Sequence, residues 1–263
     1  MMNSEEKQLL EYLTKVATLL KENLQKVVII GGFASFLYHY EKKRGVPLFS
    51  FDTDIVVSTG TYKLREKLER SGFREILARS RGRSCGKFEN EGWRYKGKIF
   101  KVELLIPLTG KDKKWGTIEN GLEGQTLRYL DMLIENVWQV KLKKDINVRI
   151  PQPGRFFLQK LLIYDKRKLP EREKDCAYIV DLVNLFFDEK GIILEEIKKF
   201  MEQNRNIPER KRWISRAISK YTELFHDSNS EGVEFALKQL TTLSRNQIIA
   251  QANIMKEGLR KIV

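Results

Sequence analysis

The feature that most restricts the fold of this chain is a change in its hydrophobic periodicity at Pro151 and Pro153. Before these prolines, short apolar segments alternate with glycine-containing turns, which indicates strands mixed with helices. After them, apolar residues recur every three or four positions almost without interruption, which indicates helices. A chain of 263 residues is long enough for two modest domains. We therefore predict an α/β domain over residues 1–150 and a helical domain over residues 151–263.

The part of the chain before Pro151 contains both the helical and the strand-like spacing of apolar residues. We expect helices at 4–24, 33–41 and 61–70, the first of them capped by Ser4. We expect strands at 26–30, 49–58, 86–90, 98–106, 137–142 and 147–150, with turns at Glu91-Gly92 and Lys96-Gly97. Segment 109–124, rich in Gly and Lys, is expected to be a loop, and 125–135 fits a helix or a strand. Later helices are expected at 153–166, 171–188, 192–204, 208–226, 230–240 and 244–261.

The charge balance indicates the kind of partner. The chain carries 49 Lys and Arg against 35 Asp and Glu, a formal net charge of +14. Such a protein is attracted to polyanions, of which nucleic acid is the commonest in a cell. A membrane surface is the other candidate. However, no apolar run approaches the length of a spanning helix, and the N-terminus MMNSEEKQLL is too polar for a secretory signal. We expect a cytoplasmic protein with no membrane partner.

Cysteine and histidine are scarce. Cys85 and Cys176 have no paired spacing, so neither a disulfide framework nor a structural zinc site is expected. The only histidines are His39 and His226. A catalytic metal would therefore be held mainly by carboxylates, the ligands that Mg²⁺ and Mn²⁺ prefer.

The segment VVIIGGFASFLYHY, residues 27–40, places a strand, a glycine pair and a helix in immediate succession. Gly31 and Gly32 permit close backbone approach, and the free N–H groups at the start of a helix attract phosphate. An ordinary strand-to-helix turn would explain the same glycines.

Two aspartates follow on the next strand. In SFDTDIVV, residues 50–57, Asp52 and Asp54 are two apart and therefore share one face of the strand. Two like charges this close repel each other, and a divalent cation between them removes the repulsion. The alternative is a solvated strand edge with incidental acids. The glycine turn about twenty residues upstream favours the metal site.

A third acid stands in the apolar strand KVELLIP, residues 101–107. A carboxylate is costly in such a setting unless it is paired or binds a ligand. Glu103 is therefore a candidate metal ligand, or the base for an attacking hydroxyl. The alternative is an exposed Glu103 facing Lys101 on the open face of the sheet.

The run GGFASFLYHY followed by SFDTDIVV resembles the nucleotidyltransferase superfamily, in which a Gly-Gly or Gly-Ser turn opens a helix and Asp-x-Asp lies on the next strand. KVELLIPLTGKD, LEGQTLRYLDMLIEN, VRIPQPGRFFLQKLLIYDKR and EREKDCAYIVDLV are similar to a prokaryotic nucleotidyltransferase-domain group related to abortive-infection toxins. The resemblance covers about residues 25–187. It implies a mixed sheet flanked by helices, followed by a helical domain that completes the nucleotide site.

The same resemblance implies roles for individual residues. Asp52, Asp54 and Glu103 would bind two Mg²⁺ (or Mn²⁺) ions around a nucleoside triphosphate; the third acid of the superfamily is more often Asp. The phosphates would be cradled by Gly31, Gly32 and Ser35. Lys160, Lys174 and Asp175 would complete the nucleotide site.

Helical spacing supports two of these residues independently. Lys160 lies on the stripe of Phe156, Phe157 and Tyr164, where a charge requires a partner or a function. Asp175 likewise lies on the stripe of Tyr178, Ile179 and Leu182. Lys160 would contact the triphosphate while Asp175 orients it. The alternative is a structural bridge between Lys160 and Asp175.

Basic residues interleaved with aromatic ones are typical of nucleic-acid binding. The candidates on the strands are Arg79, Arg81, Arg83, Lys87, Trp93, Arg94 and Lys96. A second cluster consists of Arg205, Arg210, Lys211, Arg212 and Arg216 around Trp213. Each cluster could also be an ordinary solvated face.

We therefore predict a metal-dependent nucleotidyltransferase that moves a nucleotidyl group from an NTP to a hydroxyl acceptor. The acceptor is expected to be RNA, such as the 3′ end of tRNA, and a cognate antitoxin protein is a further expected partner. Two alternatives remain. One is a small-molecule nucleotidyltransferase of the antibiotic-modifying type, and the other is a non-catalytic RNA-binding or toxin–antitoxin component of the same fold.

Overall fold

The computed structural model describes residues 3–48, 50–58, 60–61, 63–78, 82–95, 97–108, 110, 113–143, 145–189 and 191–262. The chain forms two compact units. Unit 1 consists of Met1–Glu41 and Phe49–Pro151, and unit 2 consists of Lys42–Leu48 and Gln152–Val263. Within the described residues, no helix combines the length and the apolar character that crossing a membrane requires.

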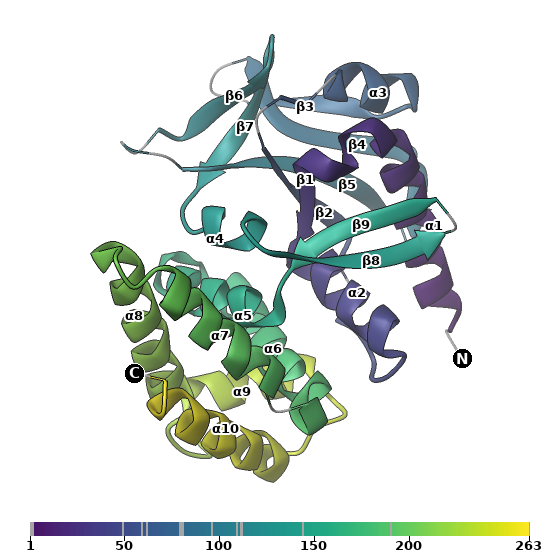
Figure 1. The fold of residues 1–263 in the computed structure, drawn as a ribbon. Coiled ribbons are helices and arrows are strands. Elements are labelled where there is room, and N and C mark those ends of the chain that lie inside the picture. Colours follow the sequence, from purple (N-terminus) through teal and green to yellow (C-terminus); the bar gives the residue numbers. More distant parts are fainter. Residues whose placement is uncertain are drawn as a thin grey trace. The chain divides into compact units, whose positions relative to one another are not determined.

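A mixed sheet forms the centre of unit 1 (Figure 1). In the described part of the chain its path is β1–β2–β5–β4–β3. The bounds are β1 Val27–Ile30, β2 Asp52–Val57, β3 Arg74–Ala78, β4 Arg83–Tyr95 and β5 Lys98–Pro107. Strand β2 is antiparallel to β1 and parallel to β5, while β4 is antiparallel to both β5 and β3. The two central strands, β2 and β5, therefore run in the same direction, side by side.

Two further pairs of strands complete unit 1. Strand β7, Leu122–Leu127, is parallel to β5, and β6, Trp115–Glu119, is antiparallel to β7. Strands β8, Val137–Lys143, and β9, Ile146–Pro151, form a separate hairpin. The partner of β5 changes along its length: Glu103 still pairs with β4, whereas Leu105 pairs with β7. The sheet therefore forks at Leu104.

Helix α1, Ser4–Leu19, covers one face of this sheet. Tyr12 stacks on Phe100 with ring centroids 4.0 Å apart, and the hydroxyl of Thr53 donates to the Tyr12 hydroxyl at 3.4 Å. The helix is capped by Asn3, which accepts a hydrogen bond from the backbone of Glu6, so the predicted cap, Ser4, was wrong by one residue. The opposite face of β2 and β5 carries the acidic side chains.

The remaining helices of unit 1 are short, apart from α2. They are the 3₁₀ helix η1, Lys21–Lys26, with α2, Gly31–Lys42, α3, Leu64–Arg70, and α4, Asp131–Ile134. The predicted helix at 4–24 therefore ends early and continues as η1. Helix α2 begins at Gly31, two residues before the predicted start.

The structure contradicts two further predictions in this unit, both on its strands. Segment 109–124 contains β6 and the start of β7, and β4 continues through the predicted turn at Glu91-Gly92 with a shift of register between Asn90 and Arg94. Gly124 misled the prediction, because it is not a turn residue here: a Cβ atom on it would lie 2.8 Å from the Leu104 carbonyl oxygen. Glycine permits close packing of strands as well as turns.

Unit 2 is helical, as predicted (Figure 1). Its α-helices are α5 Pro153–Ile163, α6 Leu169–Leu185, α7 Gly191–Gln203, α8 Pro208–Leu224, α9 Glu231–Gln239 and α10 Arg245–Arg260. Short 3₁₀ helices follow α5 and α6, namely η2 Tyr164–Lys166 and η3 Phe187–Glu189. Prolines occupy the first turns of α5, α6 and α8, where a missing N–H costs little. The mixed α/β class with a helical C-terminal region is confirmed.

Candidate functional site

Strand β2 presents its two aspartates on one face. Asp52 is exposed and Asp54 is partly exposed, whereas Thr53 and Ile55, which point the other way, are both 0% exposed. The buried side chains anchor the strand, because successive residues of a strand point to opposite faces. The predicted sharing of one face by Asp52 and Asp54 therefore agrees with the burial pattern.

The glycine turn lies directly beside this pair. Ile30, the last residue of β1, is in register with Asp54, so the turn into α2 starts at the level of the Asp54 side chain. Gly31 has a φ of +64°, and a Cβ atom on it would clash with the Asp54 carboxylate, lying 3.3 Å from its carboxyl carbon. The fold therefore brings the two motifs into contact. Ser35, one turn further along α2, is buried.

Glu103 lies in the same row of the sheet. Within the parallel pair of β2 and β5, Asp54 is in register with Glu103, and across the antiparallel pair Lys87 of β4 is also in register with Glu103. The Lys87 Nζ lies 2.9 Å from Oε1 of Glu103. Partial burial acts to lower the pKa of Lys87, but the charges of Glu103 and Asp54 outweigh it and hold that pKa above its ordinary value. Glu103 therefore pairs with Lys87 and not with Lys101, the partner that the sequence offered as an alternative.

The donor set fits a divalent cation in part. Asp52 and Asp54 offer carboxylate oxygens from one strand face, and oxygen ligands suit Mg²⁺. Among the described residues, no group of three or more His, Cys, Asp and Glu side chains is arranged to hold a metal ion. The carboxylate of Glu103 has an ammonium group as its partner. The pair of aspartates therefore fits a metal, whereas the three predicted ligands do not gather into one cluster.

Lys160 and Asp175 meet within unit 2. The Lys160 Nζ lies 2.8 Å from Oδ1 of Asp175, and the two residues are 5% and 3% exposed. The same ammonium lies over the rings of Phe156 at 5.3 Å and Tyr178 at 5.0 Å. A bridge between α5 and α6, the alternative raised by the sequence, is thus present. Lys174, which precedes Asp175 in the chain, is exposed.

Asp175 has a second cationic neighbour. The Arg167 Nε lies 3.5 Å from Oδ2 of Asp175, which is too long for a good hydrogen bond. Two cationic groups therefore offset one buried carboxylate, and a buried charge is tolerated only with such compensation.

The basic strand cluster is described only in part. Arg79, Arg81 and Lys96 lie outside the described residues, and only the backbone of Arg83, at the start of β4, is described. Arg94 is exposed, and its Nε donates to the carbonyl oxygen of Glu91 at 2.9 Å.

The other two members of this cluster have partners inside unit 1. Lys87 pairs with Glu103, as described above. The Trp93 ring packs edge-on against Tyr12 and Phe73, with both centroid distances at 5.2 Å. Tyr12 belongs to α1, which covers the face of the sheet opposite to Glu103. Trp93 therefore lies on one face and Lys87 on the other, and the two residues do not form one surface.

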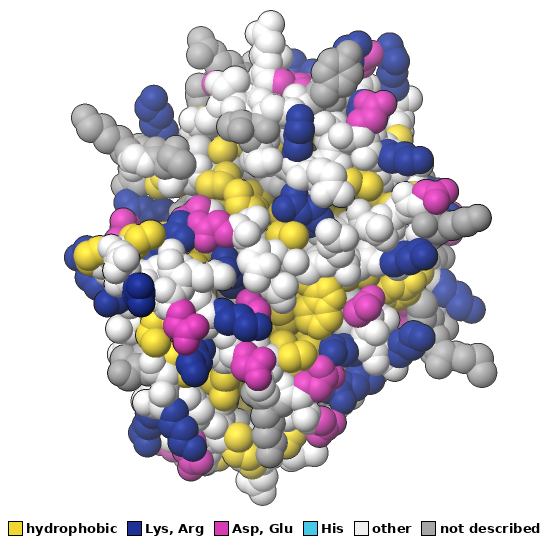
Figure 2. All heavy atoms as spheres, in the orientation of Figure 1, with side chains coloured by type: hydrophobic (Ala, Val, Ile, Leu, Met, Phe, Trp, Pro, Cys, Tyr) yellow, Lys and Arg dark blue, Asp and Glu magenta, His cyan; other side chains and the backbone are white. Residues whose placement is uncertain are grey.

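The second basic cluster lies on and just before α8. Lys211, Arg212 and Arg216 are exposed there, while Arg210 donates to Asn204 at 2.8 Å and lies over the Trp213 ring at 5.7 Å. On the face of the molecule drawn in Figure 2, Lys and Arg side chains are dispersed among acidic ones and do not gather in a single patch.

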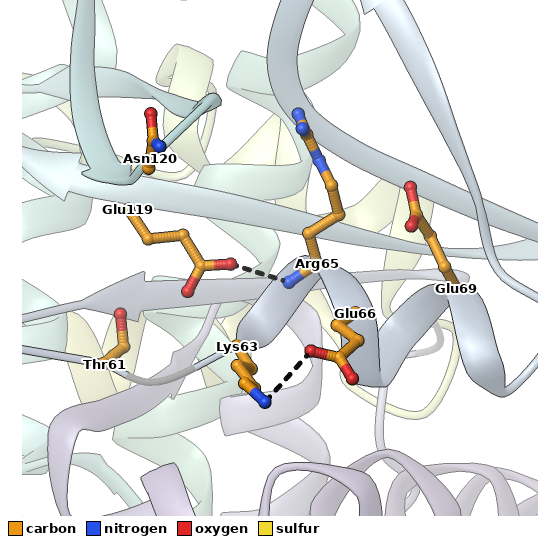
Figure 3. Close-up of a pocket in the computed structure, with 7 residues that line it drawn as sticks. All are labelled: Thr61, Lys63, Arg65, Glu66, Glu69, Glu119 and Asn120. Carbon is orange, nitrogen blue, oxygen red and sulfur yellow. Dashed lines mark hydrogen bonds and ion pairs between the residues drawn. The ribbon is translucent and has the colours of Figure 1, made fainter.

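A pocket of about 400 Å³ opens beside α3 (Figure 3). Its lining residues are Thr61, Lys63, Arg65, Glu66, Glu69, Glu119 and Asn120. Glu119 accepts hydrogen bonds of 3.0 Å from the backbone N–H groups of Leu64 and Arg65, so this carboxylate caps α3. No residue predicted for the site lines this pocket, which is separate from the row of acids.

The partnership of Lys87 with Glu103 was not anticipated. The sequence placed Lys87 among RNA-binding residues and offered Lys101 as the partner of Glu103. Only the alternation of charge on β4 and β5 hints at the pairing. The register that places Lys87 opposite Glu103 includes a shift between Asn90 and Arg94, which the sequence does not reveal.

The two acids of β2 beside the glycine turn that opens α2 agree with the resemblance to nucleotidyltransferases that the sequence shows. A family model described as nucleotidyltransferase matches residues 13–201. The chain belongs to this nucleotidyltransferase family.

Two further comparisons add little. A solved structure, described as an antigenic nucleotidyltransferase-like protein from Paracoccidioides brasiliensis, is 14% identical to this chain, with a TM-score of 0.41. The match covers 80% of this chain and 94% of that one. A comparison with curated proteins found no match.

Proposed function

We propose that this protein transfers a nucleoside monophosphate from an NTP to a hydroxyl acceptor in a metal-dependent reaction. The observation that carries the proposal is the contact between the Asp54 carboxylate and Gly31 at the start of α2, with Asp52 beside Asp54 on β2. Carboxylates that bind a cation then adjoin backbone N–H groups that attract phosphate, which is the arrangement that a metal–triphosphate complex requires.

In this reaction the acceptor oxygen forms a bond to the α-phosphorus, and the bond from that phosphorus to the bridging oxygen breaks. Pyrophosphate leaves with the bonding electrons, and the hydroxyl proton passes to a base or to water. Asp52 and Asp54 would hold a divalent cation, which neutralises charge on the phosphates. The N–H groups of Gly31 and Gly32 would bind the outer phosphates.

The resemblance to the superfamily also implies nucleotide contacts for residues of the helical part of the chain. Lys160 and Lys174 are the candidate phosphate contacts, with Asp175 orienting Lys160 through the ion pair described above. A buried lysine held by a carboxylate has a fixed position, and a fixed cation is well suited to a phosphate.

The acceptor that we propose is RNA. The net charge of +14 exceeds what a small-molecule substrate requires, and basic side chains on β4 and α8 are exposed to solvent. Binding through phosphates predicts an affinity that falls with salt, by about one unit of log–log slope for each phosphate contacted.

The decisive experiment supplies α-³²P-labelled NTPs, Mg²⁺ and total cellular RNA. Wild type should label RNA, and the double variant Asp52→Asn/Asp54→Asn should not. Asp145→Asn removes an exposed acid from a turn of the same unit and should behave as wild type. Label that enters a small-molecule extract but not RNA would favour the antibiotic-modifying alternative. If no fraction is labelled and no NTP is consumed, the result would favour the non-catalytic alternative. NTP consumption that is equal in wild type and the double variant would show that Asp52 and Asp54 do not carry the reaction.

A further inference from the structure

Lys87 occupies a position that the sheet itself determines. Strand β4 pairs with β5 up to Lys87 and Glu103, and β5 then exchanges this partner for β7 at Leu105. Gly86, just before Lys87, has a φ of +66°. A Cβ atom on Gly86 would lie 2.9 Å from the carbonyl oxygen of Leu104. The backbone of β4 is therefore packed tightly against β5 and β7 just before Lys87, and the register of β4 with β5 places Lys87 opposite Glu103.

The ion pair alters the charge of the candidate metal site. Asp52, Asp54 and Glu103 together carry three negative charges, and Lys87 offsets the one on Glu103. The two aspartates then carry a charge that one divalent cation balances. A second cation close to Glu103 would face the ammonium of Lys87, and like charges a few ångströms apart repel strongly in a partly buried site.

Lys87 also retains access to a ligand. Its side chain is 41% exposed, against 20% for Glu103. An ammonium group has three N–H donors, and the carboxylate that it pairs with takes one or two of them. A donor therefore remains for an oxygen that arrives from the solvent side.

We propose that Lys87 binds a phosphate oxygen of the nucleoside triphosphate, and that Glu103 is the residue that positions Lys87 and is not a metal ligand. This inference rests on the proposed function, because it requires a nucleotide beside Asp52 and Asp54. The site then combines a metal held by two aspartates with a fixed ammonium on the next strand but one.

The test measures binding and needs no turnover. Mn²⁺ is titrated by calorimetry into the protein, and the methylene (α,β) analogues of ATP, GTP, CTP and UTP are then titrated at saturating Mn²⁺. The variants are Lys87→Met, Lys87→Arg and Glu103→Gln. Lys141→Met is the matched control, since Lys141 is an exposed strand lysine of the same unit.

We expect Lys87→Met to raise the Kd of the preferred analogue roughly 10- to 100-fold, which is the effect of losing one hydrogen bond to a charged group. Lys87→Arg should restore most of the affinity because it keeps the charge. Glu103→Gln should leave the Kd of Mn²⁺ within about twofold of wild type while weakening the analogue, because Lys87 loses its support. Lys141→Met should change neither constant.

Two results would overturn the inference. If Glu103→Gln weakens Mn²⁺ binding tenfold or more, Glu103 is a metal ligand. If Lys87→Met lowers the melting temperature but leaves the analogue Kd unchanged, the ion pair is only structural. The double variant Asp52→Asn/Asp54→Asn separates these results from failure of the proposed function. If wild type binds neither probe, or the double variant binds both as well as wild type does, the proposed site itself is wrong and the inference falls with it.

Discussion

Substituting Gly31 with alanine tests the contact on which the proposed site depends. Gly31 has a φ of +64°, a conformation that costs an L-residue roughly 1–2 kcal/mol. The added methyl group would also displace the Asp54 carboxylate, and such overpacking costs about 1–3 kcal/mol. The two effects together predict a loss of about 2–5 kcal/mol from the free energy of unfolding.

A matched glycine separates the two effects. Gly97 has a similar φ of +78°, but a Cβ atom on it would meet no heavy atom within 4 Å. Gly97→Ala should therefore lose only the conformational part. In an Asp54→Ala background the carboxylate is absent, and the nearest remaining atom, the Cβ of residue 54, is at an ordinary 3.5 Å from the added methyl. Gly31→Ala should then cost no more than Gly97→Ala.

Urea unfolding of the four proteins of this cycle, followed by near-ultraviolet circular dichroism, gives the coupling energy. We expect Gly31→Ala and Asp54→Ala to be coupled by about 1–3 kcal/mol, because Asp54→Ala removes the overpacking, and residues in direct contact show coupling energies of this order. Gly31→Ala should also weaken the response to Mn²⁺, because Asp54 is displaced. Additive effects, together with unchanged Mn²⁺ binding in Gly31→Ala, would refute the contact.

Three further predictions follow from the geometry. The double variant Asp52→Ala/Asp54→Ala should stay folded and lose the rise in melting temperature that Mg²⁺ and NTP give wild type; an equal rise in both proteins would place the metal elsewhere. Lys160→Met should destabilise the fold by about 3–5 kcal/mol because it leaves the buried Asp175 carboxylate poorly paired, and adding Asp175→Leu should recover most of this loss in urea unfolding. Little loss in Lys160→Met would show that the pair is weak. Burial raises the pKa of the Cys176 thiol well above its ordinary value, so iodoacetamide at pH 8 should alkylate it only on unfolding; rapid alkylation of the native protein would contradict the burial.

The helices of unit 2 could be predicted from the sequence almost to their ends. Their periodicity is uninterrupted, and prolines such as Pro153 and Pro208 mark helix starts directly. Strands β6 and β7 could not be predicted in the same way. They are short, and their glycines allow the close approach of neighbouring strands, which a single sequence does not distinguish from turns.

The candidate site shows the same division between local and non-local information. Asp52 and Asp54 are two residues apart, so their shared face follows from strand geometry alone. Their contact with Gly31 and the pairing of Lys87 with Glu103 depend on the registers of β1 with β2 and of β4 with β5. Register is decided by packing across the whole sheet. The sequence therefore indicated these residues but not which of their side chains would pair.

The grouping of Lys42–Leu48 with unit 2 has a consequence for how the protein could be divided. The chain leaves unit 1 after Glu41, returns to it at residue 49, and leaves it finally after Pro151. Lys42 pairs with Glu189 at 2.6 Å, and Arg44 pairs with Asp188 at 3.0 Å. A fragment that ends at residue 151 would carry both cations without their acids, and a fragment that begins at 152 would carry both acids without their cations. A protease cut after residue 151 would leave Lys42–Leu48, a segment of unit 2, on the N-terminal piece. The two products should therefore stay associated through this segment and separate only under denaturing conditions.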